Sequence, residues 1–180
     1  YLNNVRQATQ RMGQLIDDLL KLSRVSRVEM NRTRVDLSQL AREVLTNLQM
    51  QDPDRKCELE IESGLFVSAD YNLVRVLIDN LLGNSWKFTS KKPLTQIKVG
   101  ALIQNEQSVY FVRDNGAGFD MRFIEKLFSA FQRLHHTEDY DGTGIGLATA
   151  QRVVQRHGGR IWAEGQVEEG AVFYFTLSGR

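Results

Sequence analysis

The chain has 180 residues, of which 42% are hydrophobic, and this favours one globular domain with an appendage over two full domains. Lys and Arg number 23 and Asp and Glu 22, so the formal net charge of +1 gives no reason to expect nucleic acid or an anionic membrane as the main partner. The single cysteine, Cys57, excludes an internal disulfide and favours a reducing compartment, and no apolar run reaches the roughly 20 residues of a membrane-spanning helix.

A heptad-patterned helix is expected at the N-terminus. Its apolar residues alternate between steps of three and four, as in the seam of a helix bundle: Val5, Ala8, Met12, Leu15, Leu19 and Leu22. Such a helix must bury its seam against another helix, and the alternative is a helix packed on its own domain. The polar residues 23–34 predict a helix end and a linker, so we divide the chain into 1–32 and a folded domain, 33–180.

Two helices and two short strands are expected next. Asp36 is a predicted N-cap for a helix with apolar positions from Leu37 to Leu48. Asp70 begins a longer helix whose pattern continues to Phe88, and strands are expected between the two helices, at 58–61 and 66–69.

The C-terminal half predicts further strands and a helix. Residues 119–131 predict a short helix or turns, and residues 135–144, which are polar and charged, predict a mobile loop. The remaining elements are strands at 96–103 and 109–112, a helix at 145–157, and strands at 161–163 and 172–177. We expect an α/β (α+β) two-layer sandwich, in which helices cover a mixed sheet, preceded by the long helix.

The first cluster of candidate functional residues lies on the predicted helix that ends at Phe88. Asn80, Asn84 and Lys87 are spaced four and three apart, so they share a helix face. Amide oxygens and an ammonium on one face suit a Mg²⁺ ion that bridges phosphates. A polar stripe on a surface helix is the alternative.

The second cluster follows a predicted strand. Asp114 at the end of that strand can accept a hydrogen bond from the amino group of a base, and Gly116 and Gly118 let the backbone approach a flat ring. An ordinary turn is the alternative. Phe128 and Phe131 form a third cluster, and two aromatic residues at helical spacing are also typical of a core.

The fourth cluster opens the predicted helix at 145–157. Glycines before a helix N-terminus form an anion site, and the residues concerned are Gly142, Thr143, Gly144, Gly146 and Leu147. The spacing fits neither the dinucleotide-binding fingerprint nor the P-loop.

In this order the four clusters resemble the N box, first glycine box, F box and second glycine box of sensor histidine kinases. The resemblance covers the chain from about Thr33 to Arg180, and the motif sequences are similar to those of kinases linked to phytochrome and PAS modules. It implies the fold shared by gyrase, heat-shock chaperones, mismatch-repair ATPases and histidine kinases, with ATP beneath a flexible lid. Residues 11–20 resemble the second helix of the dimerisation and phosphotransfer hairpin.

The resemblance also implies roles for individual residues. Asn84 would bind Mg²⁺ with Asn80 beside it, and Lys87 would contact the phosphates, so Asn80 and Lys87 are the catalytic candidates. Asp114 would bind the adenine amino group, with Gly116 and Gly118 shaping the pocket. Phe128 and Phe131 would anchor the lid, while Gly142, Gly144 and Gly146 would hinge it. Val172 departs from the family, where many relatives carry a hydroxyl residue, so a water-mediated contact to adenine is in doubt.

The three histidines fall outside the N-terminal helix. His135 and His136 lie in the predicted lid, and a solvated loop is favoured over a metal site there. His157 ends a helix, where the dipole favours a cation. In the family the phosphoacceptor lies on the first hairpin helix, so we expect it upstream of Tyr1, in a longer protein of which this chain is a part.

The resemblance therefore implies a kinase that transfers the ATP γ-phosphate to that histidine, for relay to an aspartate of a response-regulator receiver domain. The expected partners are ATP, the regulator and a second copy paired through the hairpin, in the cytoplasm and without membrane contact by this segment. The main alternative is an ATP hydrolase of the gyrase or chaperone type. Those relatives carry a Glu four residues before the metal-binding Asn, and Asn80 stands there instead. A dimerisation module that does not bind ATP is a third possible function, and the presence of all four boxes argues against it.

Overall fold

The computed structural model describes residues 2–132, 140 and 142–177, which form a helix-on-sheet sandwich and a long N-terminal helix. The main sheet has five strands in the order β2-β4-β5-β7-β6. These strands are β2 (Cys57–Ile61), β4 (Thr95–Gln104), β5 (Gln107–Asp114), β6 (Ile161–Gln166) and β7 (Gly170–Phe175). Only β2 and β4 pair in parallel, and the other neighbours among these strands are antiparallel. The expected mixed sheet is confirmed.

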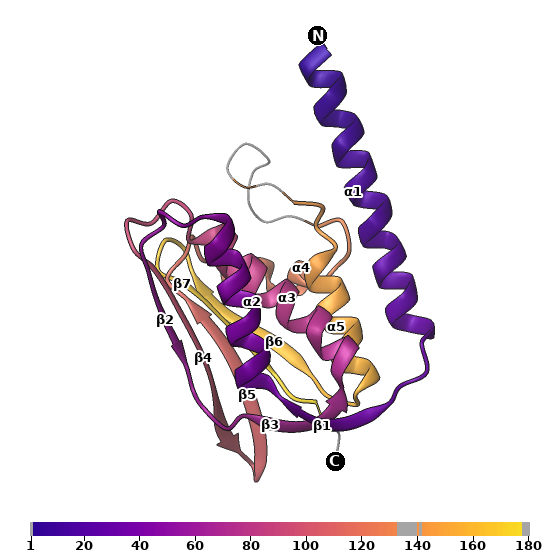
Figure 1. Cartoon of the computed structure of the whole chain (residues 1–180), viewed down its shortest axis with the longest axis vertical. Helices are drawn as coiled ribbons and strands as arrows, with labels where there is room; N and C mark the ends of the chain where they lie inside the picture. The colour runs from indigo at the N-terminus through magenta and orange to yellow at the C-terminus, as the bar shows by residue number, and fades with distance from the viewer. Residues whose placement is uncertain (1, 133–139, 141, 178–180) are drawn as a thin grey trace.

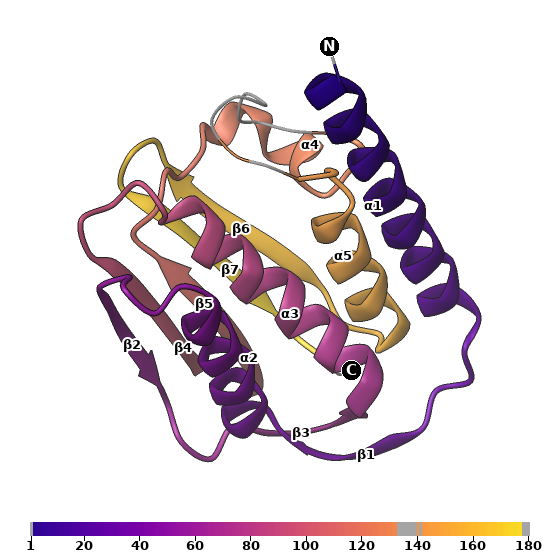
Figure 2. The same cartoon turned by 45° about the horizontal axis from the view of Figure 1, so that its top comes forward.

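Three helices cover one face of this sheet (Figure 2). They are α2 (Leu37–Gln51), α3 (Tyr71–Phe88) and α5 (Gly146–Arg156). The side chains of Asp36 and Asp70 cap α2 and α3 by accepting from the backbone N–H groups of Gln39 and Leu73. Both predicted N-caps are therefore present, and each satisfies a backbone donor that the helix itself leaves unpaired.

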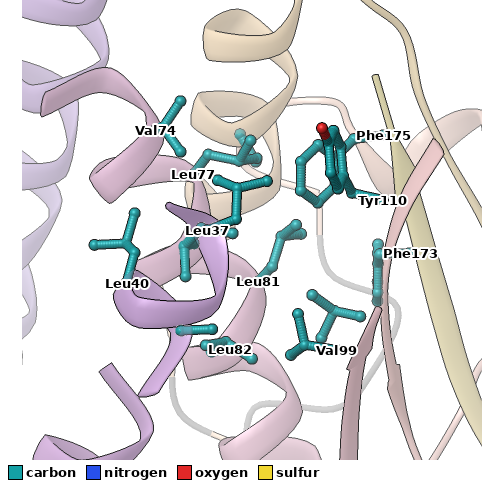
Figure 3. Packing of buried hydrophobic residues seen from close by; sticks show 14 of the residues in the cluster. Leu37, Leu40, Val74, Leu77, Leu81, Leu82, Val99, Tyr110, Phe173 and Phe175 are labelled. Carbon is teal, nitrogen blue, oxygen red and sulfur yellow. The ribbon is translucent and has the colours of Figure 1, made fainter. Parts of the chain in front are cut away.

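The core lies between α3 and the sheet. The apolar residues of α3 recur every three or four positions, so they form one buried stripe on the helix. Figure 3 shows this stripe facing α2 on one side and the inner side chains of the strands on the other: Leu37, Leu40, Val74, Leu77, Leu81, Leu82, Val99, Tyr110, Phe173 and Phe175. This packing fixes the position of α3 above the sheet, and with it the polar face that α3 turns away from the core.

The N-terminal helix α1 (Leu2–Arg27) lies beside α5 (Figures 1 and 2). Its C-terminal end packs on the domain, where Val25 is buried and its carbonyl accepts from Arg156. Farther up, Val5 and Met12 of the heptad seam are 55% and 62% exposed, and Leu19 is 44% exposed. The lower end of the helix therefore packs on its own domain, and the pairing of the exposed seam with another helix stays a prediction. No helix within the described ranges is long and apolar enough to cross a membrane.

The linker expected at 23–34 differs from the structure. The helix continues to Arg27, and Arg32–Asp36 forms a strand, β1, which pairs with β3 (Phe66–Asp70) in a small antiparallel sheet. The guanidinium of Arg32 donates to the carbonyls of His157 and Leu177, and the N–H of Asn31 donates to Asp70. Residues 32–34 are polar and exposed, so they gave no apolar strand pattern. The side chain of Arg32 instead holds the strand in place through its hydrogen bonds.

The predicted short helix within 119–131 is present in two parts, η1 (Met121–Phe123) and α4 (Ile124–Leu127). The expected mobile loop at 135–144 falls mostly on residues 133–139 and 141, which lie outside the described part of the chain, as do His135 and His136.

Candidate nucleotide-binding site

The polar face of α3 carries the first part of the candidate site. Asn80, Asn84 and Lys87 all line one cavity, because their spacing brings them to the same side of the helix. The side-chain nitrogen of Asn80 donates to the carbonyl of Val76, so the amide oxygen is left for other contacts. A side chain at Gly146 would meet this oxygen at 2.5 Å, which places the amide against the first residue of α5.

Asp114 forms the second part, at the end of β5. Side chains alternate along a strand, so Asp114 points to the same inner face as the buried Val112 and lies beneath α3. One carboxylate oxygen accepts from the Gly116 N–H and the other from the Ser85 hydroxyl, each at 2.9 Å. Burial raises the pKa of Asp114 above its ordinary value of 3.8, although donors from Gly116, Ser85 and Ala171 act against this.

The glycine-rich segment before α5 forms the third part. Gly142 and Gly144 adopt φ angles of 152° and 75°, and the carbonyl of Gly144 accepts from the Phe131 N–H. The N-terminal turn of α5 then presents backbone N–H groups without helical partners, which is a favourable place for an anion. Thr143 lies in this segment, and its hydroxyl donates to Asp18 of α1 at 2.6 Å.

A cavity of about 340 Å³ joins these three parts. This volume lies within the usual range for small-molecule sites. Residues singled out from the sequence that line it are Asn80, Asn84, Lys87, Asp114, Gly118, Gly142, Thr143, Gly144, Gly146 and Leu147. The cavity is therefore lined by a buried carboxylate, by the amides and ammonium of α3, and by the N-terminus of α5.

Three of the singled-out residues do not line the cavity. Gly116 packs against Phe88, which lines the cavity, because a side chain at Gly116 would meet the carbonyl of Phe88 at 2.7 Å. Phe128 packs edge-on against Phe173, with ring centroids 6.5 Å apart, and Phe131 is 57% exposed. Phe128 therefore belongs to the packing around the cavity wall.

Other lining residues were not predicted from the sequence as site residues. They are Gln14, Asp18, Phe88, Phe119, Leu127, Gln132, Tyr140, Ala171 and Phe173. The ring of Tyr140 packs edge-on against Phe88 at 5.0 Å. Ala171 lines the cavity, whereas its neighbour Val172 lies across from Arg113 on the other face of the sheet. The departure noted at Val172 is therefore outside the cavity.

His157 differs from expectation. Its side chain is 1% exposed, and one ring nitrogen, Nδ1, lies 2.8 Å from the carbonyl of Val153. The other ring nitrogen accepts from the backbone N–H of Asp70. Burial lowers the pKa of His157 below its ordinary value of 6.5. The expectation that His157 is a cation at this helix end is therefore wrong. The reason is that Nε2 must remain an unprotonated acceptor in this arrangement.

Comparison with known proteins decides the family. Residues 69–180, which contain α3, Asp114 and the glycine-rich segment before α5, match the family described as histidine kinase-, DNA gyrase B-, and HSP90-like ATPase. The chain belongs to this family. The matched residues form more than half of the chain, and the resemblance drawn from the four clusters is thereby confirmed.

Known proteins are similar to nearly the whole chain. The phytochrome-like protein Cph1 of Synechocystis is 36% identical over 166 residues, which are 92% of this chain and 22% of Cph1. The methanogenesis regulatory histidine kinase FilI of Methanothrix harundinacea is 34% identical over 174 residues, which are 96% of this chain and 19% of FilI. The chain thus spans about a fifth of the length of these relatives.

A solved structure supports the fold of the whole chain. The histidine kinase ThkA, in complex with the response regulator protein TrrA, superposes with a TM-score of 0.70 at 24% identity. The match covers 100% of this chain and 51% of the ThkA chain. The arrangement of helices over a mixed sheet is therefore one that a histidine kinase structure also has.

Proposed function

We propose that this chain is the ATP-binding kinase domain of a two-component sensor histidine kinase. It binds ATP with Mg²⁺ and transfers the γ-phosphate to a histidine outside residues 1–180, for relay to an aspartate of a response regulator. The observation that carries the proposal is the cavity in which the buried Asp114 and the polar face of α3 meet the N-terminal turn of α5.

Adenine is the expected occupant of the Asp114 side of the cavity. A carboxylate that is 7% exposed can accept from the exocyclic amino group of the base, and it discriminates against a base that presents an oxygen there. Phe88 and Tyr140, which pack on each other, supply apolar surface to the cavity, and this suits the flat ring.

The phosphates are expected where Lys87 and the N-terminus of α5 line the cavity. Lys87 and the N-terminal turn of α5 provide positive charge and N–H donors there. The amide oxygens of Asn80 and Asn84 are hard ligands of the kind that Mg²⁺ takes, with phosphates and waters as its other ligands. Bound Mg²⁺ would neutralise phosphate charge. The same residues then hold the γ-phosphorus open to attack.

The transfer step needs an imidazole nitrogen as the nucleophile. A new nitrogen–phosphorus bond forms on the γ-phosphorus, the bond to the bridging oxygen breaks, and ADP leaves with that electron pair. The imidazole gives up its proton to solvent. The work of this chain is to position the phosphates and to balance their charge through Lys87 and the N–H groups of α5.

Transfer to a protein is favoured over hydrolysis. The gyrase-type relatives use a Glu as a base for water, and this chain carries Asn80 in the corresponding place. An amide cannot accept a proton from water at neutral pH. The names of FilI and ThkA as histidine kinases, and the complex of ThkA with TrrA, support the same class of reaction and partner. We further propose that α1 pairs with a second copy through its exposed seam, and that this segment works in the cytoplasm.

The proposal is tested in two steps. Calorimetric titration should show binding of ATP that strengthens with Mg²⁺. Incubation with γ-labelled ATP should then label a separately supplied hairpin helix that carries the acceptor histidine, and should leave this chain unlabelled. The label should be acid-labile and base-stable, as phosphohistidine is. Stable label on this chain, or rapid release of free phosphate without transfer, would contradict the proposed kinase.

A further inference from the structure

The buried hydroxyl of Ser85 makes an unusual contact for a helical residue in this protein. Hydroxyls within helices commonly bond back to the carbonyl four residues earlier. Several do so here: Thr9 to Val5, Ser26 to Leu22, Thr89 to Ser85, and Thr149 to Ile145. Ser85 instead donates across the interior to Asp114 at 2.9 Å, and its side chain is 0% exposed.

This contact fixes the carboxylate of Asp114 in one plane. Gly116 holds one oxygen and Ser85 holds the other, so rotation of the carboxylate would break both hydrogen bonds. The two donors come from different elements, a turn and helix α3, and both are buried. The lone pairs that remain are directed by this geometry, and Asp114 also lines the cavity.

We propose that Ser85 is a positioning residue that sets the preference of the site for adenine. It rests on the proposed nucleotide function. By holding one oxygen of Asp114, the hydroxyl presents the carboxylate to the amino group of adenine in a fixed orientation. The same carboxylate repels a base that carries an oxo group at that position. Without the hydroxyl, the carboxylate can turn away, and both effects weaken.

The experiment compares the affinities of ADP and inosine diphosphate, which carries the oxo group, in Ser85→Ala and in the unaltered chain. The unaltered chain should prefer ADP, and Ser85→Ala should lower the ratio of the two affinities by roughly tenfold, as expected for a hydrogen bond to a charged group. Ser85→Cys, which keeps a weak donor, should restore part of the ratio.

Ser38→Ala is the matched control. Ser38 is equally buried and its oxygen accepts from the Leu65 N–H, but it does not line the cavity. Its removal should lower the melting temperature without changing the ratio. An unchanged ratio in Ser85→Ala, with ADP still bound by the unaltered chain, would overturn the role of Ser85 alone. Failure of the unaltered chain to bind ADP would overturn the proposed function as well.

A second, independent observation concerns Asp18 of α1. Its carboxylate lines the cavity and accepts from the Thr143 hydroxyl, in the glycine-rich segment expected to receive phosphate. Gln14, one turn earlier on the same helix, lines the cavity too. A negative side chain from outside the ATPase sheet is thus placed where a triphosphate brings more negative charge.

From this contact we infer that docking of α1 and binding of the triphosphate oppose one another. The carboxylate competes with phosphate for Thr143 and repels it. Binding of ATP therefore weakens the attachment of α1 to α5, and release of α1 strengthens ATP binding by the same factor. The inference rests on the proposed site, and it adds a device by which the helix regulates that site.

Asp18→Asn tests this inference, with Asp17→Asn as the matched control because Asp17 is exposed and does not line the cavity. Asp18→Asn should tighten ATP about fivefold, at the lower end of usual coupling factors, and should leave AMP, which has one phosphate, nearly unchanged. Asp17→Asn should change neither. Equal affinities for ATP in both variants would overturn the inference, and weaker ATP binding in Asp18→Asn would show instead that Asp18 helps to hold the metal.

Discussion

Replacement of Asp114 by Asn should separate nucleotide binding from folding. The carboxylate accepts from Gly116 and Ser85 and is expected to accept from adenine as well. An Asn amide can keep the first two contacts, because its oxygen accepts from the Gly116 N–H and its nitrogen can donate to the Ser85 oxygen. It then has no charged acceptor left for the base. Loss of a hydrogen bond to a charged group costs about 1.5–3 kcal/mol, or about 10- to 150-fold in affinity.

The folding stability of Asp114→Asn should not fall, although its affinity for nucleotide does. Burial raises the pKa of Asp114, so the folded state binds this proton more tightly than the unfolded chain does. The carboxylate therefore destabilises the fold increasingly as pH rises from 3.8 through the folded pKa. Asn carries no charge at any pH. Asp114→Asn should be at least as stable as the unaltered chain at pH 7, and this advantage should vanish below the ordinary value of 3.8.

Two measurements decide the matter. Calorimetry with ADP gives the change in affinity, and thermal unfolding of the nucleotide-free protein between pH 3 and pH 8 gives the change in stability. Unchanged affinity would remove Asp114 from the site. A large fall in melting temperature at pH 7, together with weaker binding, would mean that Asp114 acts by holding the fold, and the argument from its two protein donors would be refuted.

Other changes probe the metal face and the buried histidine. Asn84→Ala should abolish phosphotransfer in a protein that carries the acceptor histidine and leave the circular dichroism unchanged; normal labelling would place the metal elsewhere. Gly146→Ala should slow transfer on the order of 100-fold, the usual cost of a displacement of about 1 Å, because its new side chain would displace Asn80; an unchanged rate would exclude Asn80. The lowered pKa of His157 means that its contribution to stability is lost as pH falls below 6.5. In His157→Gln the melting temperature should therefore depend less on pH between pH 7 and pH 5. An equal dependence in both proteins would contradict this.

The sequence predicted the elements whose periodicity is set by burial. The helix that carries Leu77 and Leu81 and the strand that ends at Asp114 have one buried face each, and their patterns are clear for that reason. The spacing of Asn80, Asn84 and Lys87 likewise placed them on one face, and they line one cavity.

What the sequence could not reveal depends on contacts between distant segments. Strand β1 was missed because Arg32 and Thr33 are polar and exposed, and the strand is defined by its pairing with β3. Ser85 directly follows Asn84 in the sequence, yet only the fold brings its hydroxyl to Asp114, 29 residues away. Asp18 reaches Thr143 across 125 residues, and nothing in the pattern of α1 distinguishes it from Asp17.

The join between α1 and the domain is short enough to have a mechanical consequence. The N–H of Val28 still donates to Arg24 at the end of α1, and the N–H of Asn31 is already held by Asp70. Glu29 and Met30 are the residues between these two anchored positions, and two extended residues span roughly 7 Å. The connection between α1 and the domain is therefore only slightly longer than one helical turn. Because the carbonyl of Val25 also accepts from Arg156 just above this join, a twist of α1 must either turn the whole sandwich with it or break this contact and pull Asn31 from Asp70.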